Sequence, residues 1–295
     1  MLDSITDVPG VSVGHFSNMQ ARTGVTVLTF PSPNCGAADV RGGAPGTREL
    51  GLFGDAIKAI DINALMFAGG SAFGLGAAQG IVDELEREGI GAPTPTGPVP
   101  IVPAAIIYDL MVGRSDVRPG PREGRAAYIA RTADPVPMGR VGAGTGATVG
   151  KVNGFERATA AGVGSASTVV ESAVVGALVV LNAVGDVYSL DGRRLTGTDG
   201  EGATDGGALS GHNTTLIAVA TDADISDRNE LRRMAVRAHD GLGATVRPAH
   251  TRYDGDTAFV VSSPAESVDI DLIVEATFGV VVRAIHRAVE QSVVV

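Results

Sequence analysis

The chain has 295 residues, 44% of them hydrophobic, and a formal net charge of −10 at pH 7. This length and apolar content suffice for a large core, and the absence of dense lysine or arginine runs argues against a nucleic-acid-binding surface. The single cysteine, Cys35, cannot form an internal disulfide, which favours a reducing compartment and a structural role for this thiol.

No secretory signal or membrane span is expected. The first residues contain neither a basic stretch nor a long apolar stretch. The apolar region near 270–289 is interrupted by charged residues such as Asp271 and Arg283, so it is interpreted as a buried amphipathic helix. The sequence therefore predicts a cytoplasmic protein.

The first half of the chain predicts strands and one helix. Alternating apolar residues indicate strands at 25–30 and 63–68. A helix is predicted at 72–88, with Ser71 as its N-cap and Gly89 at its carboxyl end. Five prolines follow this helix and indicate an extended, irregular segment.

The second half continues the alternation, which favours sheets covered by helices. A nearly continuous apolar run at 174–188 predicts a pair of strands, or one long bent strand, in a sheet buried on both faces. Gly243 is expected to end a helix. The remaining elements are predicted as a strand at 216–221, a helix at 226–242, a strand at 257–262 and a helix at 269–290.

A run of small and polar residues at 196–212 ends at Asn213, and Thr214 leads directly into a predicted strand. This composition predicts a flexible linker over 193–212. A cut before Thr214 would create an α-amine with a pKa near ~7.7–8.0, suited to act as a base for the hydroxyl of the same residue. The alternative is an ordinary loop that enters a strand, which is the commoner meaning of an Asn-Thr pair alone.

Two glycine-rich segments are similar to motifs of other enzymes, but the spacing of their glycines does not match those motifs. The stretch at 142–151 has Thr145 where a phosphate-binding loop requires glycine, so a turn for close backbone packing is the alternative. The stretch at 69–73 has Phe73 where the nucleophile elbow of the α/β-hydrolases requires glycine. Ser71 is therefore not expected to be a nucleophile.

Three polar residues stand out from their surroundings. Asn182 interrupts the apolar run at 174–188, and a buried amide must find hydrogen-bond partners. A satisfied core amide and a functional group are both compatible with this position. Asp254 and Asp256 flank a glycine, a pattern that is usually a turn.

The histidines show no metal-ligand spacing, and none forms a recognisable pattern with Cys35. No metal and no cofactor are therefore expected. The histidines are interpreted as structural, and His212 as a residue that shapes the loop before Thr214. They stand at positions 15, 212, 239, 250 and 286.

Stretches from end to end of the chain carry a resemblance to a known family. They are ITDVPGVSVGH (5–15), DVRGGAPGTRE (39–49), GGSAFGL (69–75), VPIVPAAIIYDL (99–110), GAGTGATVGK (142–151), GALVVLNAVGDV (176–187), HNTTLIAVATDA (212–223), HDGL (239–242) and HTRYDGDTAF (250–259). The chain resembles the self-processing aminopeptidases, which include the L-aminopeptidase/D-esterase, the β-peptidyl aminopeptidases and the nylon-oligomer hydrolase. This resemblance implies an α+β fold, a four-layer αββα sandwich like that of the N-terminal-nucleophile hydrolases, with 1–295 as a single domain.

The resemblance also implies self-cleavage between Asn213 and Thr214, into a large fragment of 1–213 and a small fragment of 214–295. Thr214 would then act through an acyl-enzyme on amides, short peptides or esters with a free amino end. A homotetramer without metal or cofactor is implied as well. Members that act on α-peptides, β-peptides and ω-amides share these motifs.

The resemblance assigns roles to further residues. Asn182 is implied as the donor to the oxyanion, and Lys151 as the cation that keeps the new amine neutral by like-charge repulsion. Asp254 and Asp256 are implied to orient the amine and the hydroxyl, and the nylon-type members also carry two aspartates here. The implied substrate-pocket residues are Tyr108, Ser71 and Thr215.

Two alternatives remain beside the aminopeptidase hypothesis. The related ornithine acetyltransferases use a similar self-cleaved threonine, but their sequence around it differs from the HNTTL of 212–216. An unprocessed relative that only binds small amines, without catalysis, is the other alternative.

Overall fold

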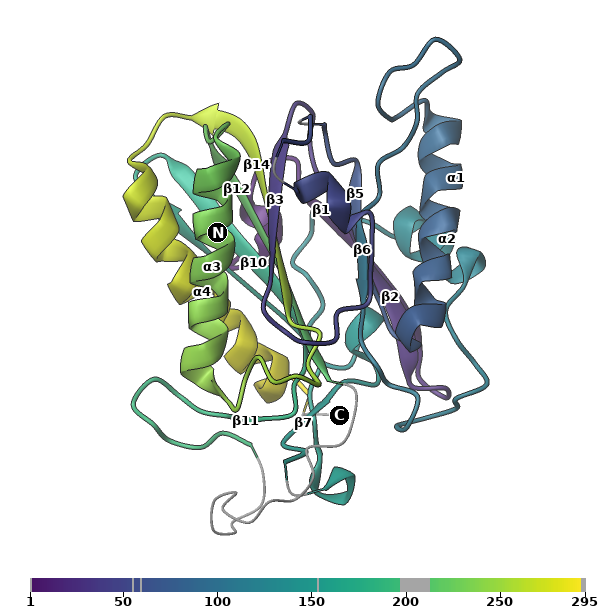
Figure 1. Ribbon diagram of the computed structural model, residues 1–295, viewed down its shortest axis with the longest axis vertical. Helices are drawn as coiled ribbons and strands as arrows, with labels where there is room; N and C mark the ends of the chain where they lie inside the picture. Colours follow the sequence, from purple (N-terminus) through teal and green to yellow (C-terminus); the bar gives the residue numbers. More distant parts are fainter. Residues whose placement is uncertain (1, 55, 59, 153, 197–212, 293–295) are drawn as a thin grey trace.

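The computed structural model describes residues 2–292 apart from 55, 59, 153 and 197–212. In this part of the chain, two five-stranded sheets face each other. One pair of helices covers the outer face of each sheet (Figure 1). The α+β, four-layer αββα sandwich that the resemblance implied is therefore confirmed.

The first sheet packs against two helices, α1 (Ala78–Glu88) and α2 (Pro121–Ile129). Its β5 and β6 strands are parallel and its other neighbouring strands are antiparallel. In spatial order the strands are β1 (Ser12–Asn18), β2 (Thr23–Thr29), β5 (Ala64–Ala68), β6 (Ala104–Ile106) and β4 (Thr47–Arg48).

The second sheet lies under α3 (Arg228–Thr245) and α4 (Ile270–Glu290). Its central strands β12 and β14 are parallel, although the rest of the sheet is antiparallel. In spatial order the strands are β3 (Cys35–Val40), β14 (Thr257–Glu266), β12 (Thr214–Ala223), β10 (Ala173–Asn182) and β9 (Val163–Val170).

Short elements connect these layers. Two-residue strands pair as β7 (Thr148–Val149) with β8 (Thr159–Ala160), and as β11 (Asp186–Val187) with β13 (Val246–Arg247). Short 3₁₀ helices lie at Ile5–Asp7, Leu50–Phe53, Ser71–Ala77, Gly142–Gly144 and Phe155–Arg157.

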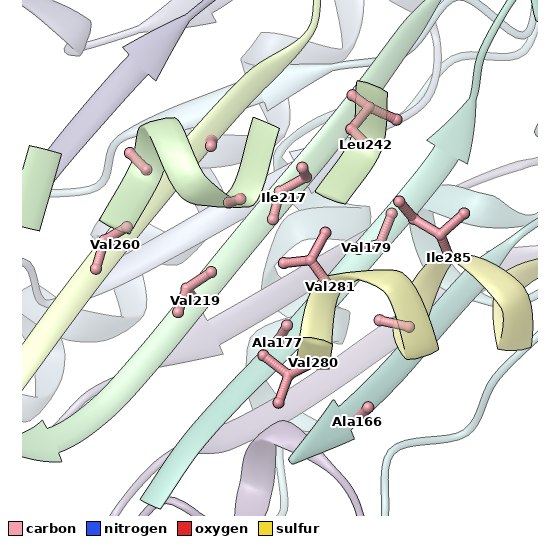
Figure 2. Packing of buried hydrophobic residues seen from close by; sticks show 14 of the residues in the cluster. Ala166, Ala177, Val179, Ile217, Val219, Leu242, Val260, Val280, Val281 and Ile285 are labelled. Carbon is pink, nitrogen blue, oxygen red and sulfur yellow. The ribbon is translucent and has the colours of Figure 1, made fainter. Parts of the chain in front are cut away.

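The strand β10 shows why the central strands are apolar throughout. Its alternate side chains point to opposite faces. Ala177 and Val179 join the cluster beneath α3 and α4, whereas Leu178 and Val180 join the cluster between the two sheets. Figure 2 shows Ala177 and Val179 near Val281 of α4. Because both faces are covered, neither face needs polar residues.

The central elements agree with the sequence predictions. The strands predicted at 25–30, 63–68, 216–221 and 257–262 and the helix at 269–290 are confirmed with small changes of bounds. The run at 174–188 contains two strands, β10 and the short β11. Within the described residues, no helix is long and apolar enough to cross a membrane.

Two predictions about helix ends are wrong. Ser71 is not an N-cap: the first turns after it are 3₁₀, their N-cap is Gly70, and no capping hydrogen bond from a side chain is present. The helix α3 does not end at Gly243 but continues to Thr245. A glycine ends a helix when it adopts a positive φ, as Gly89 does at 71°, and Gly243 does not.

Candidate active site

The start of β12 brings the predicted cleavage site into a buried environment. Thr214 is its first residue and pairs with Asn182, the last residue of β10. The Thr214 hydroxyl donates a hydrogen bond to the carbonyl oxygen of Asn213. The N–H of Gly255 donates to the same oxygen at 2.8 Å. The hydroxyl therefore lies against the peptide group that precedes it, and a backbone donor already binds the oxygen of that group.

The turn with the two aspartates lies against β12 because the loop after β3 packs on it. The N–H of Arg41 donates to the carbonyl of Asp256 at 3.0 Å, and the N–H of Ala44 donates to the carbonyl of Asp254 at 2.8 Å. A Cβ on Gly42 would lie 2.2 Å from the Asp254 carbonyl oxygen, so only glycine permits this approach. The stretch at 39–49 thus positions the turn.

The two aspartates are both buried but differ in their contacts. Asp256 accepts from the N–H of Thr215 at 2.7 Å, and its other oxygen lies 2.9 Å from Nδ1 of His250. Asp254 accepts from the N–H and the hydroxyl of Thr251 through Oδ2. Its Oδ1 is buried and has no hydrogen-bond partner in the described part of the chain. Burial, and then the negative charge of Asp256, raise the pKa of Asp254.

Lys151 contacts the amide of Asn182. Its Nζ lies 3.1 Å from both the side-chain Oδ1 and the backbone carbonyl oxygen of Asn182. The N–H of Thr148 also donates to Oδ1, and the Asn182 Nδ2 donates to the carbonyl of Tyr108 at 3.2 Å. An amide nitrogen carries two hydrogens, so Asn182 has a second one for a further acceptor. Burial lowers the pKa of Lys151 to about 7, although Asp254 acts in the opposite direction.

The predicted pocket residues differ in their burial and in how close to Thr214 their contacts place them. The N–H of Ser71 donates to the carbonyl of Ile107 at 3.0 Å, which places Ser71 beside Tyr108. No described contact joins Ser71 to Thr214. Thr215 is fully buried, and its hydroxyl has no hydrogen-bond partner among the described residues.

His250 contacts Asp256 of this site, although all five histidines were expected to be structural. Its ring contacts Asp256 and packs edge-on against His239, with 4.9 Å between the ring centroids. The available sequence signal was its place six residues before Asp256 in the HTRYDGD stretch. His212, and the predicted linker from 197 onwards, lie outside the described residues.

Comparison with known proteins decides the family. From residue 3 to 295 the chain matches the model of peptidase family S58. This chain belongs to peptidase family S58. An uncharacterized aminopeptidase of Mycobacterium leprae is 40% identical, over 90% of this chain and 79% of the relative. A 6-aminohexanoate-oligomer endohydrolase of Paenarthrobacter ureafaciens is 32% identical, over 87% of this chain and 74% of the relative.

Solved structures share the fold of this S58 protein. A β-aminopeptidase of a Burkholderia species has a TM-score of 0.73 and 22% identity, over 100% of this chain and 87% of that one. The L-aminopeptidase D-Ala-esterase/amidase of Ochrobactrum anthropi has a TM-score of 0.74 and 19% identity, over 99% of this chain and 85% of that one. The family resemblance is confirmed, and membership of this peptidase family makes the S58 protein a hydrolase.

The groups that could react at this site are buried side chains of the protein itself. No group of histidine, cysteine, aspartate and glutamate in the described residues could hold a metal ion. The cluster combines a hydroxyl, an amide, a lysine with a lowered pKa and two carboxyl groups. Such a set is compatible with acyl transfer, because it combines a hydroxyl, an amide that can donate to an oxyanion and a lysine whose pKa lies near neutral pH.

Proposed function

We propose that this S58 hydrolase cuts its own chain between Asn213 and Thr214 and then uses Thr214 as an N-terminal nucleophile. The observation that carries the proposal is the hydrogen bond from the Thr214 hydroxyl to the Asn213 carbonyl, in a site where Gly255 already donates to that oxygen. These contacts hold the hydroxyl at the peptide group that it attacks, and they supply a donor for the charge that develops on the oxygen.

Self-cleavage begins as an N→O acyl shift. Thr214 Oγ1 attacks the carbonyl carbon of Asn213, the C–N bond to Thr214 breaks, and the hydroxyl proton ends on the released nitrogen. Water then cleaves the resulting ester, which leaves a carboxylate on Asn213 and a free α-amine on Thr214. The products are the fragments 1–213 and 214–295.

In turnover, the Thr214 amine takes the hydroxyl proton while Oγ1 attacks the substrate carbonyl, and water hydrolyses the acyl-enzyme. Asn182 donates to the oxyanion through the second hydrogen of its amide, which Lys151 orients. The positive charge of Lys151 favours the neutral form of the amine. Because burial lowers the pKa of Lys151 to about 7, the lysine and the amine compete for a proton near neutral pH.

The two aspartates also act on the nucleophile. Asp254 Oδ1 is buried without a described partner, and a cationic amine created by the cut would supply one. Asp256 binds the N–H of Thr215 and so fixes the start of β12. The walls of the substrate pocket are Tyr108, Ser71 and Thr215, and the Thr215 hydroxyl assists hydrolysis.

The proposed substrates are short peptides, amides or esters with a free amino end. Relatives that are named aminopeptidase and 6-aminohexanoate-oligomer endohydrolase support this class. The test compares amino-acid p-nitroanilides with the same compounds acetylated on the amine. Hydrolysis of the free amines and no hydrolysis of the acetylated forms is the expected result.

Two other outcomes would replace the proposal. Acetyl transfer from N-acetylornithine to glutamate that is faster than any hydrolysis would make the protein an acetyltransferase. Binding of amines by an uncut, inactive chain would make it a non-catalytic binding protein. We also propose the homotetramer that the family resemblance implies, and light scattering on the purified protein measures the assembly directly.

A further inference from the structure

A cavity of about 280 Å³ lies beside the candidate active site. This volume is far larger than a single water requires and is enough for a small organic molecule. The cavity is lined by two arginines, by apolar residues and by part of the glycine-rich stretch, among them Arg22, Arg140, Met111, Val112, Phe155 and Thr148.

The arginines make this cavity locally basic in a protein of net charge −10. In the described part of the chain, neither Arg22 nor Arg140 forms an ion pair with a carboxylate, whereas nearby Arg114 pairs with Asp116 at 2.6 Å. Burial, and then the positive charge of Arg22, lower the pKa of Arg140. Arg140 is half-buried and Arg22 is exposed. An anion between the two guanidinium groups would offset their repulsion and the cost of partly burying Arg140.

The position of Arg22 depends on an unusual backbone. Its φ is 53°, in the left-handed region that residues other than glycine rarely adopt. A Cβ on Gly146 would lie 2.0 Å from the carbonyl oxygen of Arg22, so the glycine-rich stretch packs directly against this backbone. Such conformations persist where the surroundings enforce them, and they concentrate at ligand sites.

Thr148 connects the cavity to the candidate active site. Its N–H donates to Oδ1 of Asn182 at 3.1 Å, and the residue lines the cavity. Its hydroxyl is buried and has no hydrogen-bond partner among the described residues. A ligand in the cavity would therefore contact the residue that touches the proposed oxyanion donor. Met111 and Phe155 are large exposed apolar residues at the same cavity, and they suit the apolar part of a ligand.

We propose that this cavity is a carboxylate-binding site, in which Arg22 and Arg140 bind the free carboxylate of an amino acid or short peptide. A guanidinium group binds a carboxylate through two parallel hydrogen bonds, and it is the side chain best matched to that shape. The carboxylate belongs either to the substrate itself or to a second small molecule. Only the first source rests on the proposed function.

Binding is tested with N-acetyl-L-leucine and N-acetyl-L-leucinamide, which differ in the carboxylate and have no free amine. Calorimetry on the full-length wild-type protein should show that the acid binds at least about tenfold more tightly than the amide, as expected for hydrogen bonds to a charged group. Arg140→Met and Arg22→Met should each abolish this preference, and Arg140→Lys should retain part of it.

The control is Arg114→Met, which removes the same charge from an arginine already paired with Asp116. This variant should keep the preference for the acid. Circular dichroism confirms that each variant is folded before it is compared. Equal binding of acid and amide to the wild type, binding of neither, or the same preference in both cavity variants would overturn the proposal.

Kinetics separate the two sources of the carboxylate. If the substrate supplies it, a dipeptide should have a higher kcat/KM than the dipeptide amide, and the cavity variants should lose that preference. An arginine-dependent binding of N-acetyl-L-leucine without such a preference supports the site for a second molecule and overturns its role in substrate selection. If no hydrolysis is found at all, the proposed function fails while the binding experiment still decides the carboxylate site.

Discussion

A threonine hydroxyl depends on its neighbours for reactivity, and at Thr214 these neighbours come from distant parts of the chain. Asn182 ends β10, Lys151 follows β7, and Asp254 and Asp256 lie in the turn before β14. Lys151 and Asp254 both have pKa values displaced toward neutrality by burial. A lysine with a pKa of about 7 exchanges protons at physiological pH, as the proposed activation of Thr214 requires.

The first prediction concerns the nucleophile. Thr214→Ala should give one uncut chain without measurable activity, because it removes the only atom proposed to attack. Thr214→Ser retains a hydroxyl and should still cut. Intact mass measurement distinguishes the full chain from the fragments 1–213 and 214–295. Efficient cutting of the alanine variant would move the nucleophile elsewhere, with Thr215 as the next candidate.

The second prediction concerns the pH–rate profile. Lys151→Met removes a nearby positive charge, so the pKa of the Thr214 amine should rise and the acidic limb should move to higher pH. Asp254→Asn removes a negative charge and should move the limb to lower pH. The profiles are measured on protein that mass measurement shows to be cut. Two normally cut variants with the wild-type profile would show that neither residue acts on the amine.

The third prediction follows from the lowered pKa of Lys151. Between its unfolded value near ~10.4 and its folded value of about 7, the unfolded chain binds the extra proton, so stability falls as pH decreases through this window. The Lys151→Met variant has no titrating group at this position, so it should not lose stability in this way as the pH decreases. Both forms are compared in the Thr214→Ala background so that each is one chain. Urea unfolding should show the free energy of the lysine form falling relative to the methionine form from pH 10 to pH 7, and a constant difference would contradict the burial of Lys151.

At the scale of elements, glycines set how closely the layers approach. A Cβ on Gly164 of β9 would lie 1.9 Å from the carbonyl oxygen of Ala284, in the backbone of α4. The backbones of α4 and β9 can therefore come this close only because residue 164 has no side chain. In contrast, nothing lies within 4 Å of a Cβ added to Gly243, on the exposed side of α3.

These two glycines form a matched pair for the fourth prediction. Gly164→Ala should lower the free energy of unfolding by about 1–3 kcal/mol or more, because backbone atoms of α4 cannot move aside without displacing the helix. Gly243→Ala should raise it by about 0.4–1 kcal/mol, since alanine is the better residue in a helix. Denaturant unfolding measures both, and a neutral Gly164→Ala would mean that α4 does not pack this closely on β9.

At the scale of the molecule, the two proposed fragments are interleaved. The strands β12 and β14 belong to 214–295, and they lie between β3 and β10, which belong to 1–213. The large and small fragments therefore share one sheet and the cores on both of its faces. This arrangement supports the prediction that 1–295 is a single domain.

The fifth prediction is that cutting does not separate the fragments. Both edges of the β12–β14 pair are hydrogen-bonded to strands of the large fragment, so release would expose two strand edges and the apolar residues of both faces. The fragments should elute together in size-exclusion chromatography and separate only in denaturant. Loss of the small fragment in native buffer would contradict the interleaved sheet.

The sequence by itself determined the elements whose signals are local. The apolar runs of β10 and β12 and the amphipathic α4 were all predicted, because hydrophobic periodicity depends on neighbours in the chain. The positions of Thr214 and its partners came from motifs. Those motifs name the residues but carry no information on distances or burial.

The tertiary structure decided what depends on distant contacts. The strand β3 consists of small and polar residues and was not predicted, since its strand conformation comes from pairing with β14. The left-handed conformation of Ser71 and the shared cavity of Arg22 and Arg140 also lacked a local signal. Each arises from segments that only folding brings together, and the free energy of those contacts outweighs the local preference of the chain.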